Sequence, residues 1–192
     1  MARNIEFNEE EAIKKAMEVF WKKGYSGTSI RDLSDAMHIH ISSIYNTIGD
    51  KHQLFVKCIH NYTQGRMKEA LAHSANIKSP LKAIINFIND AVNVILYSSN
   101  SCLAIKTTFE LATTDPEIQA ILREDDNFTH RFLLGLVKNA MEMKELDTET
   151  DAETVTDFII NNFTGWHESY ILHKDAVKIK KMAKYLINQI SG

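Results

Sequence analysis

Residues 28–55 carry the pattern that most constrains how this chain folds. Their apolar side chains recur every three or four positions over residues 30–37 and again over 41–48, which is the spacing of two short amphipathic helices. A tight turn at residues 37–39 separates them, and a further helix begins near residue 50. Two helices joined by such a turn form a helix-turn-helix, whose second helix fits the major groove of DNA.

Several short elements recur through this stretch and the helix before it. They are an amphipathic first helix ending in Lys23-Gly24-Tyr25, then Thr28-Ser29, Ile30-Arg31-Asp32-Leu33, Ser43-Ile44-Tyr45 and Gly49-Asp50-Lys51. Together they resemble the DNA-binding domain of the TetR family of bacterial transcriptional regulators, and their spacing agrees with the family without a gap over roughly a quarter of the chain. The resemblance implies an all-α, nine-helix fold and a ligand-responsive repressor of the AcrR-like kind.

Two segments depart from the family pattern. The turn usually has Ala-Gly where this chain has Met37-His38, so we expect His38 to adopt the left-handed backbone that glycine favours. The recognition helix usually opens with Ser-Lys-Gly or similar, whereas here it opens with His40-Ile41-Ser42, which lacks the phosphate-binding lysine. Ile41 either contacts a thymine methyl group or faces the core of the domain.

The side chains predicted to contact DNA are hydroxyls, amides, imidazoles and cations of this motif. Four of them are expected at phosphates: Thr28, Ser29, Tyr45 and Lys51. Five are expected nearest the bases: Arg31, His40, Ser42, Ser43 and Asn46. His38 and Ile41 complete the predicted DNA-binding set.

Charge and composition add little to this prediction. The net charge is −3 and the sequence pI is about 6.2, so the chain as a whole is not a polycation and any basic surface is local. Two distant cysteines, Cys58 and Cys102, make no disulfide framework. There is no signal-peptide pattern and no long apolar run, so a cytoplasmic protein is expected, nucleoid-associated when bound to its operator.

The rest of the chain shows helical periodicity and no useful strand pattern. We expect an N-terminal three-helix helix-turn-helix head, residues 1–50, as the DNA-binding domain. Residues 51–192 are expected to form a helical bundle that binds a ligand and dimerises. Helices are predicted over residues 8–23, 30–37, 41–48, 50–73, from Ser79-Pro80 onward, and over 102–112, 116–144, 151–173 and 175–190.

A largely apolar pocket with a few polar groups is the usual form of a small-molecule site. Each aromatic candidate is equally compatible with ordinary core packing, and His167 with a satisfied helix residue. The predicted pocket residues are Phe87, Tyr97, Phe109, Phe128, Phe132, Met141, Phe163, Trp166 and His167.

The last two predicted helices carry apolar stripes, which intramolecular packing explains in part. The resemblance implies that these helices pair with their copies in a second subunit, giving a homodimer that suits a palindromic operator in double-stranded DNA. The predicted interface residues are Val155, Ile159, Trp166, Tyr170, Met182, Tyr185, Leu186 and Ile190.

Cys102 stands near a predicted helix start with Lys106 one turn later, and both features favour a reactive thiolate. One hypothesis is therefore a regulator triggered when an electrophile or oxidant modifies Cys102; the alternative is a small buried residue. An activator, or a DNA-binding protein without an effector, also remains open. No enzyme motif, metal site or cofactor is expected, because His167 and His173 stand six apart rather than four and no phosphate-binding loop occurs. The predicted partners are operator DNA, a small-molecule inducer and a second copy of the chain, with no membrane.

Overall fold

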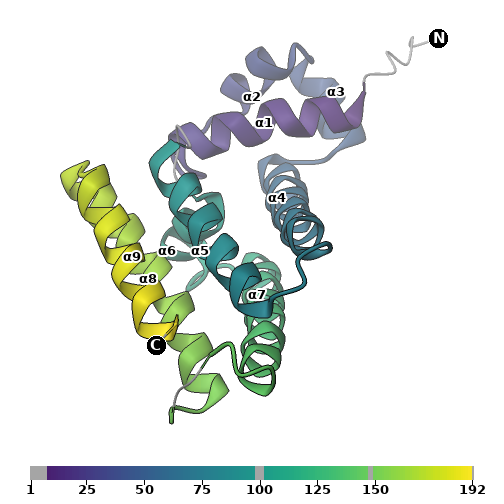
Figure 1. Cartoon of the computed structure of the whole chain (residues 1–192). Coiled ribbons are helices and arrows are strands. Elements are labelled where there is room, and N and C mark those ends of the chain that lie inside the picture. The colour runs from purple at the N-terminus through teal and green to yellow at the C-terminus, as the bar shows by residue number, and fades with distance from the viewer. Residues whose placement is uncertain (1–7, 98–101, 147–148, 192) are drawn as a thin grey trace. The chain divides into compact units, whose positions relative to one another are not determined.

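The computed structural model describes residues 8–97, 102–146 and 149–191, which form nine α-helices and no strand (Figure 1). The all-α fold predicted from the sequence is confirmed, and the predicted helix ends agree with the observed ones to within about two residues. The helices are α1 (Glu9–Lys23), α2 (Ile30–Met37), α3 (Ile41–Thr47), α4 (Lys51–Ser74), α5 (Pro80–Tyr97), α6 (Leu103–Leu111), α7 (Pro116–Glu142), α8 (Ala152–His173) and α9 (Ala176–Ser191).

The chain divides into two compact units. The first unit comprises residues 1–64 and 103–122, and the second comprises residues 65–102 and 123–192. Helices α4 and α7 therefore each contribute residues to both units. The division into domains at residues 50 and 51 stays a prediction, since a compact unit is defined by packing and not by function.

The first unit is built around the helix-turn-helix. Asn8 caps α1 by accepting a hydrogen bond from the Glu11 amide at 3.2 Å. α1 packs on α2 and α2 on α3, and their core centres on Phe20, which meets Phe55 of α4 edge to face with ring centroids 4.8 Å apart. Leu33 and Ile44 are both fully buried. The apolar residues that recur over residues 30–48 thus form the buried face that holds α3 in place.

The turn between α2 and α3 has the backbone predicted for it. His38 ends α2 with φ 58° and ψ 39°, in the left-handed region. The Ser34 hydroxyl closes the turn by donating to the Ile39 carbonyl at 2.6 Å. An exposed histidine therefore holds a conformation that glycine adopts without strain.

Replacing His38 with glycine is expected to stabilise the protein. The His38→Gly variant removes the Cβ that strains a left-handed residue, and the expected gain in unfolding free energy is about 1 kcal/mol. Urea unfolding of both proteins measures it. His40→Gly is the matched control, because His40 has an ordinary extended backbone (φ −61°) and gains nothing from glycine. A His38→Gly variant less stable than the wild type would contradict this account of the turn.

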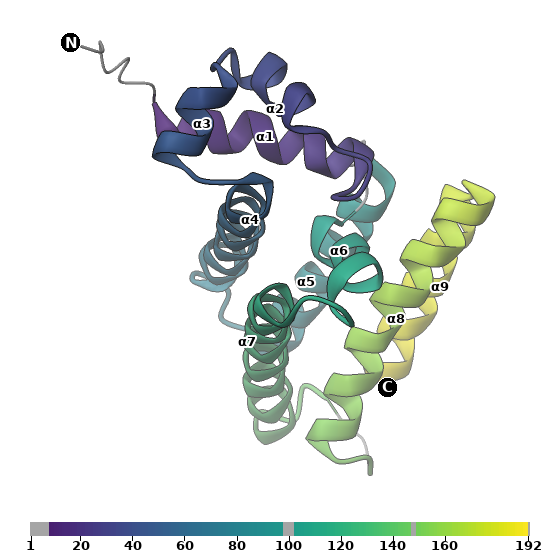
Figure 2. The ribbon, with the colours of Figure 1, turned by 180° about the vertical axis from the view of Figure 1, so that it is seen from behind.

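The second unit contains a core shared by α5, α7, α8 and α9. α5 packs against both α8 and α9, which also pack against each other and lie side by side in both ribbon views (Figures 1 and 2). Ile88, Leu133, Ile159 and Ile179 in this core are fully buried. Ser79 caps α5 as predicted, accepting from the Lys82 amide at 3.1 Å. No helix within the described ranges is long and apolar enough to span a membrane.

Candidate nucleic-acid interface and ligand region

Helix α3 presents an uncharged polar surface. Tyr45 is 51% exposed, and Ser42, Asn46 and Thr47 are also exposed, whereas Ser43 is half-buried. Ile41 is exposed rather than packed in the core, so an apolar contact with a thymine methyl group is open to it. The helix carries no acidic or basic side chain in either terminal turn. Thr47 was missing from the predicted set, although it stands one turn after Ser43 on the same helix.

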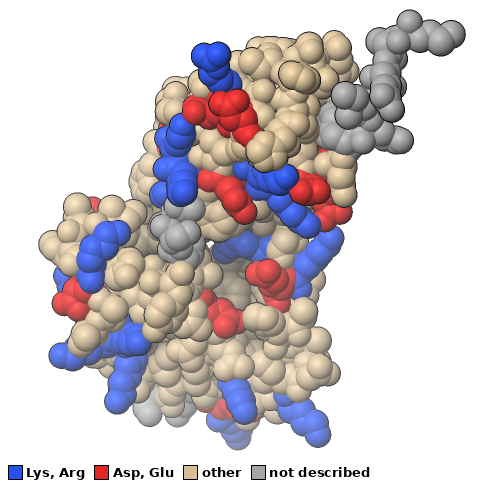
Figure 3. All heavy atoms as spheres, turned by 90° about the horizontal axis from the view of Figure 1, so that it is seen from above, with Lys and Arg blue, Asp and Glu red and all other residues tan. Residues whose placement is uncertain are grey.

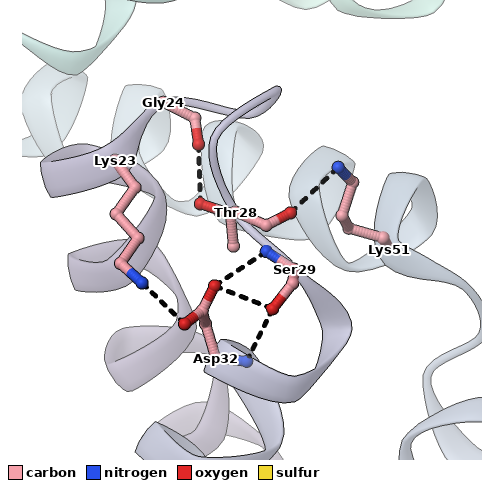
Figure 4. Close-up of polar contacts among 6 residues, drawn as sticks. All are labelled: Lys23, Gly24, Thr28, Ser29, Asp32 and Lys51. Atoms are coloured by element: carbon pink, nitrogen blue, oxygen red, sulfur yellow. Dashed lines mark hydrogen bonds and ion pairs between the residues drawn. The ribbon is translucent and has the colours of Figure 1, made fainter.

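The start of α2 is held by a reciprocal cap (Figure 4). The Ser29 hydroxyl accepts from the Asp32 amide at 3.1 Å, while the Asp32 carboxylate accepts from the Ser29 amide at 2.9 Å. Lys23 adds an ion pair to the same carboxylate at 2.6 Å. The hydrogen bond from Lys23, followed by those from Ser29, holds the pKa of Asp32 well below its usual range. The cap therefore stays charged and fixes the N-terminal turn of the first helix of the motif.

Two of the residues predicted at phosphates have partners within the first unit. Thr28 is 2% exposed and its hydroxyl donates to the Gly24 carbonyl at 2.6 Å. The Lys51 ammonium donates to the carbonyls of Tyr25 and Thr28, each at 3.0 Å, and lies 4.2 Å from the centre of the Tyr25 ring. These carbonyls belong to the loop between α1 and α2, where no helix satisfies them. Thr28 and Lys51 therefore hold this loop, and their contact with phosphates stays a prediction.

Side chains of helix α6 bind the same loop and the end of α1. The Glu110 carboxylate accepts from the amides of Tyr25 at 3.0 Å and Ser26 at 2.7 Å, and Lys106 donates to the Trp21 carbonyl at 3.1 Å. Sequence reasoning missed Glu110, because nothing in its local pattern distinguishes an acid that binds a distant loop from a solvent-exposed one. Within the first unit, α6 is thus tied directly to the helix-turn-helix.

Basic side chains do not form a continuous surface on the face that Figure 3 displays. Figure 3 shows Lys and Arg mixed with Asp and Glu on the face that it displays. In the motif itself Arg31, His38 and His40 are exposed. This distribution fits the prediction that any positive surface is local, with backbone amides and hydroxyls supplying much of the contact to phosphates.

Five of the predicted pocket aromatics form one cluster in the second unit. The ring of Phe132 lies 6.0 Å from Phe128 and 5.7 Å from Phe87. Phe163 lies 5.9 Å from Phe87 and 5.7 Å from Trp166. The four phenylalanines are half-buried, so part of each ring remains accessible, whereas Trp166 is buried.

The other predicted pocket residues differ in their exposure to solvent. Met141 is half-buried and packs on the second unit's core. Tyr97 and Phe109 are 70% and 75% exposed, so placing them in a pocket was wrong for the conformation described. Aromatic character alone does not tell an interior ring from a surface ring, which is why these two were included.

A buried polar group adjoins the aromatic cluster, and sequence reasoning found only one of its members. His167 is 4% exposed. Burial, and then the positive charge of Arg66, lower its pKa to about 4. Arg66 of α4 pairs with Asp125 of α7 at 2.8 Å. Burial raises the pKa of Asp125, against the opposing effect of Arg66. Asp125 precedes Phe128 by one turn of α7, a signal that the sequence did contain.

Both cysteines are buried. Cys102 directly precedes α6, as expected, but it is only 4% exposed. Burial raises the pKa of the Cys58 thiol well above its usual range. A reagent in solvent therefore does not reach Cys102 in this conformation, which argues against the hypothesis of direct modification. Among the residues that the structure describes, no group of acidic, histidine or cysteine side chains is arranged to hold a metal ion.

The predicted dimer residues lie mostly in the chain's own core. Val155, Ile159, Trp166, Leu186 and Ile190 are all buried within one protomer, and their assignment to a subunit interface stays a prediction. Tyr170 and Met182 are half-buried against the same core.

Tyr185 alone of the predicted dimer residues is largely exposed, at 65%. Apolar side chains that sequence reasoning had left out of the interface accompany it on α8 and α9. They are Phe158, Ile171, Leu172 and Val177, which are 50–66% exposed. The periodicity identified two amphipathic helices correctly, but it did not show which stripe packs inside the protomer.

Two family profiles match this chain. One, described as the bacterial regulatory proteins of the tetR family, covers residues 12–58. The other, described as the tetracyclin repressor-like C-terminal domain, covers residues 80–186, more than half of the chain. The chain belongs to the TetR family. It is therefore a DNA-binding transcriptional regulator, as the resemblance implied.

Curated proteins of the same kind are similar over most of their length. An uncharacterised HTH-type transcriptional regulator of Bacillus subtilis, YezE, is 29% identical over 79% of this chain and 81% of its own. The HTH-type transcriptional repressor ComR of Escherichia coli is 23% identical over 80% of this chain and 74% of its own.

Solved TetR structures share the fold. A TetR-family regulator from Agrobacterium tumefaciens superposes with a TM-score of 0.87 at 17% identity, over 95% of this chain and 97% of its own. CifR in complex with a 26-base-pair operator gives 0.80 at 20% identity, over 97% and 98%. FadR of Bacillus subtilis in complex with stearoyl-CoA gives 0.78 at 13% identity, over 96% and 98%.

Proposed function

We propose that this TetR-family protein is a homodimeric repressor that binds a palindromic operator and leaves it when a small molecule binds the second unit. The observation that carries the proposal is helix α3, which is anchored by the buried Ile44 and exposes Ser42, Tyr45 and Asn46 to solvent. Hydroxyl and amide groups on an exposed helix suit the donor and acceptor pattern of the major groove. The operator complex of CifR, which has the same fold, supports this use of the helix.

Roles along the motif follow from exposure. Tyr45 and Ser29 are placed at phosphates, and Asn46 and Ser42 at base edges, with Arg31 and His40 beside them. Asn46 is the side chain best suited to specify a base, because its amide forms paired hydrogen bonds with adenine. The imidazole of His38 stands at the exposed turn, where a phosphate contact is the simplest role.

Release from DNA on ligand binding is proposed to act through α4 and α6. α4 contributes Lys51 to the loop of the helix-turn-helix at one end and Arg66 to the second unit further along. A ligand that binds the released conformation more tightly by a few kcal/mol shifts the population away from the operator-bound form. FadR, crystallised with stearoyl-CoA, shares the fold and supports a ligand-responsive regulator of this kind.

The finer assignments belong to the same proposal. The DNA-binding domain is residues 1–50, and residues 51–192 form the ligand-binding and dimerisation domain. The protein is nucleoid-associated while it is bound to its operator. An activator with the same DNA interface is the second candidate, and a transcription assay with and without ligand separates the two.

Alanine substitutions in α3 test these roles. Tyr45→Ala is expected to weaken binding to every duplex by a similar factor, because a phosphate contact is independent of sequence. Asn46→Ala is expected to cost about 1–3 kcal/mol on the preferred duplex and little on a scrambled one. Fluorescence anisotropy with the duplex that binds best from a random pool, and with its scrambled version, measures both. Equal losses on the two duplexes for both variants would overturn this division of roles.

A further inference from the structure

An ion pair and a histidine from three helices meet inside the second unit. The Arg66 guanidinium of α4 binds the Asp125 carboxylate of α7 at 2.8 Å. The charge of Arg66 also acts on the buried His167 of α8. The two partners of the pair differ in access, since the side chain of Arg66 is 36% exposed and that of Asp125 only 9%. The positive member is therefore the one that a molecule arriving from solvent meets first.

Asp125 and His167 each share a helix face with residues of the aromatic cluster. Along α7, Asp125, Phe128 and Phe132 are three and four residues apart and so share one helix face. Along α8, Phe163 and His167 are four apart and share a face in the same way. Phe87 connects the two faces through its contacts with Phe132 and Phe163. One end of this region is thus charged and the other is lined with half-buried rings.

The charges of Arg66 and Asp125 favour a ligand with a negative charge. A cationic head group that approaches this region meets the partly exposed side chain of Arg66 and is repelled by its charge. An anionic head group is attracted to Arg66 and competes with Asp125 for it. Burial already disfavours the charged form of Asp125, and Asp126 beside it on α7 adds to that effect. Displacing the carboxylate from Arg66 removes the one effect that lowers the pKa of Asp125, so that pKa rises further.

We infer that the second unit binds an amphiphile with an anionic head group, with Arg66 holding the head and Phe128, Phe132 and Phe163 contacting its apolar body. This inference rests on the proposed ligand-responsive function and specifies its ligand class. His167 is neutral at pH 7 and supplies a polar, uncharged wall. Opening the ion pair also frees α4 from α7, which links occupancy of the site to the helix that carries Lys51.

A matched pair of probes tests the charge preference. 1-Anilinonaphthalene-8-sulfonate is an aromatic anion, and N-phenyl-1-naphthylamine is the same ring system without the sulfonate. Both become fluorescent in apolar sites, so their affinities are measured in the same titration with the full-length protein. The variants are Asp125→Asn, which keeps the arginine, and the double variant Arg66→Gln with Asp125→Asn, which replaces the whole pair with neutral groups. Arg131→Gln, at an exposed position of α7, is the control for loss of one positive charge.

The expected order of sulfonate affinity is Asp125→Asn, then wild type, then the double variant. Asp125→Asn is expected to bind the sulfonate at least threefold more tightly, and the double variant at least tenfold more weakly than the wild type. The neutral probe is expected to change by less than twofold throughout, and Arg131→Gln to match the wild type. Sulfonate affinity is expected to rise as the pH falls in the wild type, because Asp125 competes for Arg66 only as a carboxylate, and to rise less in Asp125→Asn.

Three results would overturn the inference: unchanged sulfonate affinity in the double variant, parallel changes for both probes, or no saturable binding of either probe at 100 μM, a concentration of the usual screening order. Circular dichroism of each variant separates lost binding from lost folding. The proposed DNA-binding function is tested without these probes. A failure here with operator binding intact therefore rejects the ligand class and leaves the regulator assignment standing.

Discussion

Leu172→Glu is expected to convert the dimer into a folded monomer. Leu172 is 66% exposed in the protomer, and it stands fourteen residues, close to four helical turns, after Phe158 on α8. Both side chains therefore lie on one stripe of the helix, and both are largely exposed in the protomer. In a twofold interface each residue occurs twice, so one substitution buries two carboxylates. We expect the dimer dissociation constant to rise at least 100-fold, because an unpaired buried charge is strongly unfavourable.

Sedimentation velocity at about 10 μM protein, a concentration at which the wild type is expected to be dimeric, measures this change. The matched control is Leu71→Glu, which places the same charge at a leucine that is 51% exposed on α4. That variant is expected to remain a dimer. Circular dichroism is expected to show wild-type helicity for both. A dimeric Leu172→Glu protein would place the interface elsewhere on the molecule.

His167 is expected to make the protein lose stability as the pH falls from 7 toward 4. Its pKa is lowered from 6.5 to about 4, chiefly by burial and then by Arg66, so the folded protein holds it neutral. Between these two values the unfolded chain binds the proton and the folded protein does not. Stability is therefore complete above the unfolded pKa and declines below it. The full difference corresponds to about 3 kcal/mol.

Urea unfolding at pH 7, 5.5 and 5 checks this, with His167→Gln as the variant that removes the titrating group. We expect the wild type to lose about 1.5–2 kcal/mol relative to the variant between pH 7 and 5. Asp125, whose pKa is raised by burial, acts in the opposite direction, but it is present in both proteins and so does not affect the comparison between them. His40→Gln, at an exposed position, is expected to follow the wild type. Identical pH dependence in His167→Gln and the wild type would contradict this assignment.

Local patterns in the sequence predicted the local structure well. The left-handed turn at His38 and the start of α5 at Ser79-Pro80 each depend on a few neighbouring residues, and both are observed. Helical periodicity also placed all nine helices to within about two residues. These features depend on backbone geometry and capping, which short segments encode.

Long-range contacts could not be predicted in this way. Lys51 was expected at DNA, and in the structure its ammonium donates to carbonyls 23 and 26 residues away in the chain. Val155 and Leu186 were expected between subunits, and each is buried within one protomer. The residue type suits both roles in each case, and only the tertiary arrangement decides which partner the side chain meets. Arg66 was missed because an ion pair across 59 residues leaves no local signature.

The central claim is that a dimer of this chain reads DNA through α3, and selection from a randomised duplex pool tests it most directly. Purified wild-type protein is mixed with the pool at about physiological ionic strength, where non-specific phosphate binding is weak, and bound sequences are amplified and counted. The account predicts enrichment of one palindrome, with half-sites about one helical turn apart or slightly more. A protein that is folded and dimeric but enriches no sequence would contradict it.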